Sequence, residues 1–163
     1  GGVLVGAAVN RNPGLFDKVI LTNAFVDLAS TMDRPNLFLT KHEYDEFGNP
    51  STDSAAKARI RSYCPVYNLR PTAQCQNTST RFLIIGTLDD PNVPYWNATL
   101  YFRKLLKGLE ETPVVDENST ANHSNERQND RVFLELQTSG GHHFSGPNRI
   151  DVVALENAFT LKL

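Results

Sequence analysis

Three runs of apolar residues stand out along the chain as strand-like segments. They cover residues 18–21 (KVIL), 81–87 (RFLIIGT) and 132–136 (VFLEL). Continuous apolar runs of this length are typical of parallel strands that are buried on both faces of a sheet. We therefore expect three strands of a parallel sheet, with 81–87 buried on both faces.

Helices are expected before, between and after these strands. The small apolar stretch 3–10 predicts a helix that ends at Asn12-Pro13-Gly14, and 54–61 (SAAKARIR) predicts a short helix capped by Ser54. Two further helices, over 94–110 and at the end of the chain, carry apolar residues on one side: Trp96, Leu100, Leu106 and Leu109, then Val152, Leu155 and Phe159. Helices that alternate with parallel strands define the α/β class.

The remaining segments predict less regular structure. Residues 25–53 are interrupted by proline and glycine, which favours a long surface excursion with helical pieces, and 63–80 reads as loop. The polar stretch 111–130 lacks periodicity and predicts a disordered surface insertion.

Composition excludes several classes of function. The 163 residues carry a net charge of −2, and no apolar run approaches the roughly 18 residues of a membrane-spanning helix. We therefore expect no nucleic-acid partner and no membrane partner. Cys64 and Cys75 lack zinc-ligand spacing, so no metal is expected, and two independent thiols are favoured over a disulfide. N-x-S/T sequons, a weak hint of a secretory route, occur at Asn77, Asn97, Asn118 and Asn122.

The residues suited to catalysis follow the predicted strands. Asp89 and Asp90 come after the strand 81–87, and the loop after 132–136 contains His142 and His143. Gly1-Gly2, at the start of a closely packed helix, matches the tail of a G-x-S-x-G-G nucleophile elbow. An elbow, then an acid, then a histidine is the chain order of the α/β-hydrolase triad.

Several stretches resemble the prolyl oligopeptidase family, and its oligopeptidase B branch most closely. The resemblance covers nearly the whole chain outside 111–130, and its most specific stretches are FLTKHEYDEFGNP (38–50) and LDDPNVPYW (88–96). It implies the C-terminal part of an α/β-hydrolase catalytic domain, here residues 1–163. The serine two residues before Gly1, the elbow and the family's propeller domain would then lie outside this chain.

The resemblance also implies site residues. The triad acid falls on Asp90 rather than Asp89, and the histidine falls on His142, with His143 as the alternative. The acidic pair that binds a basic P1 side chain in oligopeptidase B corresponds to Glu43 and Asp45. In an extended segment, side chains two residues apart lie on the same side, so both carboxylates could hold one guanidinium. Glu46 is a third candidate.

The function that these residues imply is hydrolysis of short peptides after Arg or Lys by a serine endopeptidase. No cofactor is expected, and the expected partners are short peptides and the rest of the same polypeptide. Without the serine, the piece alone should be inactive. The alternatives are a post-proline endopeptidase of the same family and a non-catalytic binding domain derived from the fold. Family resemblance favours the cytoplasm, whereas the sequons hint at secretion.

Overall fold

A three-stranded parallel sheet forms the centre of the computed structural model, which describes residues 1–70, 79–110, 131–144 and 147–161. Its strands are β1 (Lys18–Thr22), β2 (Arg81–Thr87) and β3 (Val132–Gln137), in the order β1-β2-β3. Val19 pairs with Phe82, and Phe82 in turn pairs with Val132. The three predicted strands and their parallel arrangement are confirmed.

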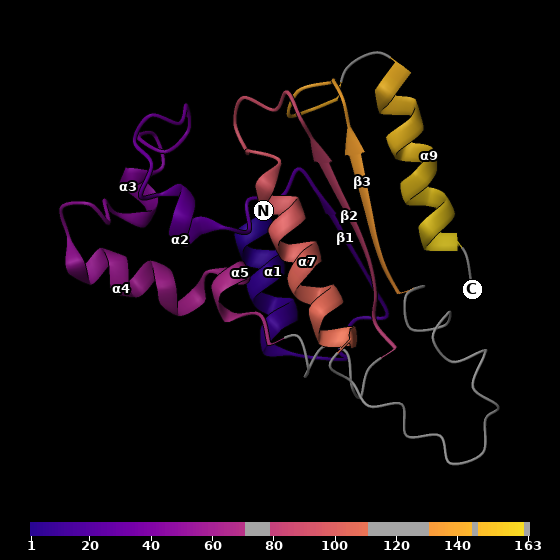
Figure 1. Ribbon diagram of the computed structural model, residues 1–163, viewed down its shortest axis with the longest axis horizontal. Coiled ribbons are helices and arrows are strands. Elements are labelled where there is room, and N and C mark those ends of the chain that lie inside the picture. Colours follow the sequence, from indigo (N-terminus) through magenta and orange to yellow (C-terminus); the bar gives the residue numbers. More distant parts are fainter. Residues whose placement is uncertain (71–78, 111–130, 145–146, 162–163) are drawn as a thin grey trace.

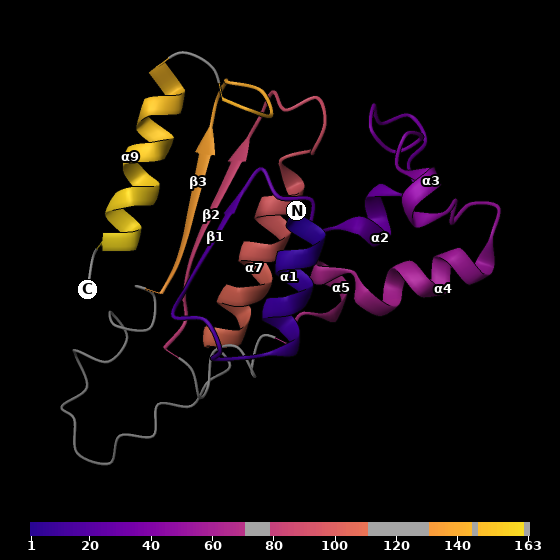
Figure 2. The ribbon, with the colours of Figure 1, turned by 180° about the vertical axis from the view of Figure 1, so that it is seen from behind.

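Helices cover both faces of this sheet (Figure 1). The helices α1 (Gly2–Arg11), α5 (Pro65–Asn68) and α7 (Trp96–Glu110) pack on one face. The helix α9 (Pro147–Leu161) packs on the other face, as the view from behind also shows (Figure 2). The predicted α/β class is therefore confirmed.

The central strand β2 has a separate core on each side. Phe82 and Ile84 join the cluster formed with α1 and α7, whereas Leu83 and Ile85 join Val152 and other residues of α9. All four side chains are at most 2% exposed. Burial on both faces explains why this strand is a continuous apolar run instead of an alternating one.

The segment between β1 and β2 extends away from the sheet and contains α2 (Leu28–Thr31), α3 (Tyr44–Phe47) and α4 (Ser54–Tyr63) (Figure 1). The expectation of helical pieces in this excursion is confirmed. The predicted cap of α4 is wrong by one residue, because the carboxylate of Asp53 accepts the hydrogen bond from Ala55 N at 2.8 Å.

Other details of the predicted helices need correction. Leu100 is 38% exposed, whereas the predicted Leu109 is buried, together with Tyr101 and Leu105, which the prediction missed. The expected loop 63–80 contains the short helix α5 and the end of α4. The expected disorder of 111–130 lies outside the described residues. Among the described helices, none has the length and apolar character needed to cross a membrane.

Candidate active site

The loops that follow the three strands meet at one edge of the sheet, because parallel strands end on the same side (Figure 1). Asn23 directly follows β1, Asp89 and Asp90 follow β2, and His142 lies in the loop after β3. This edge therefore brings together Asp90 and His142, two residues that the sequence suggests for catalysis, although they are 52 positions apart in the chain.

Asp90 and His142 form a close pair at this edge. The Asp90 Oδ2 atom lies 2.8 Å from His142 Nδ1, and the Asp90 side chain is fully buried. The other oxygen, Oδ1, accepts hydrogen bonds from Asn92 N at 2.8 Å and Val93 N at 2.9 Å. Two backbone N–H groups and the imidazole of His142 thus surround one buried carboxylate and fix its direction.

This geometry prepares the imidazole for proton transfer. An ionised carboxylate at Nδ1 selects the tautomer with a proton on that atom and leaves Nε2 as the basic nitrogen. The His142 side chain is 25% exposed, so the ring keeps access to a substrate.

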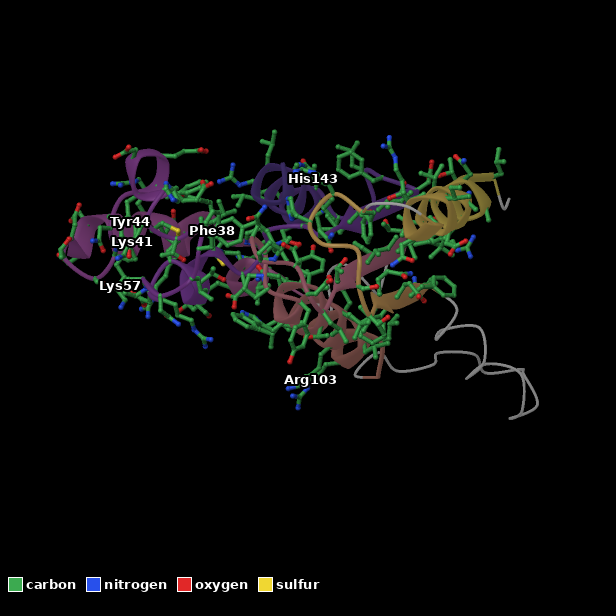
Figure 3. All side chains as sticks on the ribbon, turned by 90° about the horizontal axis from the view of Figure 1, so that it is seen from above. Phe38, Lys41, Tyr44, Lys57, Arg103 and His143 are labelled. Atoms are coloured by element: carbon green, nitrogen blue, oxygen red, sulfur yellow. The ribbon has the colours of Figure 1, made fainter. Side chains whose placement is uncertain are left out.

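The other candidate histidine has a different position. His143 is exposed, and its ring packs edge-on against that of His142 with 4.7 Å between the ring centres. Figure 3 labels His143 at the loop after β3. Asp90 therefore pairs with His142, which the sequence resemblance favours, and the other acid, Asp89, bonds to the backbone of the histidine loop.

A cavity of about 840 Å³ opens beside His142. It extends along the first turns of α1 from Gly1 and Gly2 to α3, where Glu43 and Glu46 contribute to its lining. A β-carbon at Gly2 would overlap the backbone of Ala24 and Phe25, so only glycine allows this close approach. The N-terminus of α1 and His142 thus face one space.

The acidic segment differs from its predicted conformation. Glu43 has helical dihedral angles (φ −83°, ψ −6°) and precedes α3, which includes Asp45 and Glu46. The expected extended conformation is wrong, and so is the argument that Glu43 and Asp45 share a side. In a helix, residues three apart are neighbours, whereas residues two apart diverge. Glu43 and Glu46 accordingly both line the cavity, whereas Asp45 is absent from its described lining.

The position of α3 is fixed from α4. The guanidinium of Arg59 donates a hydrogen bond to Phe47 O at 3.2 Å, and Gly48 ends the helix with a φ of 88°. Phe47 also packs edge-on against Phe25, with 6.5 Å between ring centres. In Figure 3, Tyr44 marks α3 within the segment that holds α2, α3 and α4, to the left of His143.

Two sequence features acquire a structural interpretation away from the catalytic edge. The Asn97 side chain is 1% exposed, and its Oδ1 accepts hydrogen bonds from Val26 N and Asp27 N. Its sequon is therefore inaccessible in the folded chain, and the other three sequons lie outside the described residues. Cys64 is a free, buried thiol. Cys75, like the three sequons, lies outside the described residues.

Sequence patterns alone do not single out Asn23, which also belongs to this edge. It is 6% exposed, and its amide donates hydrogen bonds to Gly141 O at 3.2 Å and His142 O at 3.0 Å. The available signal is a polar residue directly after an apolar strand. Among the described residues, no group of three or more His, Cys, Asp or Glu could hold a metal ion.

A model of the prolyl oligopeptidase family matches residues 1–162. The chain belongs to the prolyl oligopeptidase family. A curated relative, the prolyl endopeptidase-like protein of Gallus gallus, is 34% identical over 164 residues, which represent 99% of this chain and 21% of the relative.

Solved structures of the family have the same fold. Oligopeptidase B from Leishmania major aligns with a TM-score of 0.73 and 28% identity, over 97% of this chain and 19% of that one. Oligopeptidase B from Trypanosoma brucei with covalently bound antipain aligns with a TM-score of 0.68 and 27% identity, over 99% and 21% of the respective chains. The fold is thus that of an α/β-hydrolase, and the chain spans about a fifth of the length of these family members.

Proposed function

We propose that the whole protein is a serine-type oligopeptidase whose acid and base are Asp90 and His142. The observation that carries this proposal is the 2.8 Å contact between the buried Asp90 carboxylate and His142 Nδ1, at the edge of a cavity lined by Gly1 and Gly2. The nucleophilic serine of the whole protein would stand two residues before Gly1, at the entrance of α1.

The reaction would proceed by acyl transfer. His142 Nε2 accepts the serine proton while the serine Oγ bonds to the carbonyl carbon of the scissile peptide. The resulting imidazolium, stabilised by Asp90, gives that proton to the leaving amine as the C–N bond breaks. Water then attacks the acyl-enzyme ester, again with His142 as base, and releases the acid and the free serine.

Substrates with Arg or Lys at P1 are proposed from the acidic end of the cavity. Glu43 lines it, and a carboxylate there would offer charge-assisted hydrogen bonds to a guanidinium or ammonium group. The second carboxylate would come from the same helix: family resemblance favours Asp45, whereas the cavity lining favours Glu46. The resemblance of residues 38–50 to oligopeptidase B also supports the basic preference.

Isosteric amide variants of the full-length protein test this pocket. We expect Glu43→Gln to lower kcat/KM for an Arg-P1 peptide by about 10- to 100-fold, because it removes a charge-assisted hydrogen bond. Turnover of a matched peptide with a neutral P1 glutamine should change little. Asp45→Asn and Glu46→Gln, each made separately, identify the second carboxylate by the same loss.

Lys41→Gln serves as a control, because it alters an exposed charge near this segment without removing a carboxylate. An Arg preference that survives Glu43→Gln, Asp45→Asn and Glu46→Gln would eliminate the proposed pocket.

A post-proline activity is the second candidate, because curated relatives such as the Gallus gallus protein are called prolyl endopeptidase-like. Under this alternative, a Pro-P1 peptide is cleaved faster than an Arg-P1 peptide, and Glu43→Gln leaves the ratio unchanged. The acidic lining at Glu43 and Glu46 favours the basic substrate, since an uncompensated carboxylate beside an apolar proline ring gains no partner.

A further inference from the structure

The loop that presents His142 is anchored on both sides by side chains outside the acid–base pair. Its glycines adopt left-handed conformations, with φ of 133° at Gly140 and 65° at Gly141. Such a loop has many alternative conformations in isolation, so its shape in the active site must be imposed by its contacts.

Asn23 provides the contacts on one side. Its Nδ2 donates to Gly141 O and His142 O, and its Oδ1 accepts a hydrogen bond from Thr87 Oγ1 at 3.1 Å. The backbone of Asn23 has a positive φ of 44°, and its N–H donates to Ile85 O at 2.9 Å. Asparagine tolerates this conformation better than most residues. One buried side chain thus connects the ends of β1 and β2 with the histidine loop.

Asp89 provides the contacts on the other side. Its Oδ1 accepts a hydrogen bond from Gly141 N at 3.0 Å, and its Oδ2 accepts one from Gly140 N at 3.3 Å. The two adjacent acids after β2 therefore act on the same loop: Asp89 holds its backbone, and Asp90 holds the imidazole of His142.

We propose that Asn23 and Asp89 are positioning residues, which hold the Gly140–His142 backbone so that the His142 ring stays aligned with Asp90. This inference rests on the proposed function. Neither side chain is assigned a contact with substrate, so each acts through His142. Their loss should therefore lower kcat with little change in KM, since a shift of about 1 Å in a catalytic group can cost on the order of 100-fold in rate.

Asn23→Asp and Asp89→Asn in the full-length protein test the proposal separately. Asn23→Asp keeps the size and the tolerated φ of the side chain but replaces the amide donor with an acceptor that faces two carbonyl groups. Asp89→Asn keeps one acceptor oxygen of two. We expect each variant to lower kcat about tenfold or more on a preferred peptide, with KM within about twofold.

Asn12→Asp and Asp53→Asn are matched controls. They make the same chemical changes at side chains that bond to backbone on α1 and α4, away from the loop. Both should keep the parent kcat. If Asn23→Asp does not fold, the exposed Asp89→Asn still decides the outcome, since it alters no core residue.

A nuclear magnetic resonance readout separates this inference from the proposed function. With 15N-histidine label, the Nδ1 proton of His142 should give a strongly downfield signal that broadens in Asn23→Asp and Asp89→Asn but not in the controls. That result in a protein without peptidase activity supports positioning and refutes the proposed function. Parental kcat in both variants, with an unchanged His142 signal, would overturn the inference itself.

Discussion

At the scale of single residues, the arrangement around His142 assigns different tasks to adjacent side chains. Asp90 is buried and bonds to the ring, whereas Asp89 is exposed and bonds to the loop backbone. His142 faces the cavity, and His143 packs on its outer side. Chemically identical neighbours thus differ in burial and direction, which is what decides their roles in the proposed reaction.

Separate substitution of the two histidines tests this division. In the full-length protein, His142→Ala should reduce kcat by about 10³-fold or more, because it removes the proposed general base. His143→Ala should keep most of the activity, since its ring is exposed and Asp90 pairs with His142. The measurement is kcat for one peptide with each variant. Equal activity of both variants would rule out His142 as the base.

At the scale of elements, apolar periodicity predicts well where burial decides the structure. The central strand β2 is recognisable because both of its faces are buried, and the face of α9 that carries Val152 and Phe159 is buried as expected. The short helix α3 escapes the same reasoning. Its four residues are about one helical turn, which is too short to show a period, and its conformation depends on distant contacts such as the bond between Arg59 and Phe47.

The contact between α7 and α1 can be tested through Tyr101, whose hydroxyl bonds to Asn10. Tyr101 is fully buried, its hydroxyl donates to Asn10 Oδ1 at 3.0 Å, and burial raises the pKa of its phenol. The folded state binds the phenol proton of Tyr101 more tightly than the unfolded state does. The contribution of this proton to the free energy of unfolding is therefore complete below a pH of about 10 and is lost as the pH rises above it.

Tyr101→Phe should therefore lower the free energy of unfolding by about 1 kcal/mol at neutral pH, through the lost hydrogen bond. Near pH 11 the parent should lose about 1.4 kcal/mol of unfolding free energy, because its phenol ionises on unfolding and the variant has no phenol there. The difference between the two proteins should therefore vanish or reverse sign. Denaturant titrations at several pH values measure both effects. Tyr67→Phe is the control at an exposed phenol; a pH-independent difference for Tyr101→Phe would contradict the account.

At the scale of the whole molecule, topology brings the candidate site together. The chain order and the parallel sheet predict that an acid after β2 meets a histidine after β3, since these strands are neighbours. The choice of Asp90 and His142 within each adjacent pair came from the family resemblance, and the structure pairs these two residues. Contacts that depend on the exact paths of loops are not predictable in this way. Asn23 and the cavity lining by Glu46 depend on loop conformations that no local pattern encodes.

The α/β-hydrolase region described here is about a fifth of the length of its family relatives, and its proposed active site requires a nucleophile beside Gly1. The central claim is that Asp90 and His142 activate a serine at that position. A fluorophosphonate probe forms a bond with an activated serine oxygen and releases fluoride, so its site of attachment identifies the nucleophile.

Mass spectrometry of the labelled full-length protein, compared with its His142→Ala variant, tests this claim most directly. The account predicts one labelled serine two residues before Gly1, with labelling strongly slowed in His142→Ala and preserved in His143→Ala. Absence of labelling in the parent protein, attachment at a different residue, or equal labelling rates in the parent and His142→Ala would contradict it.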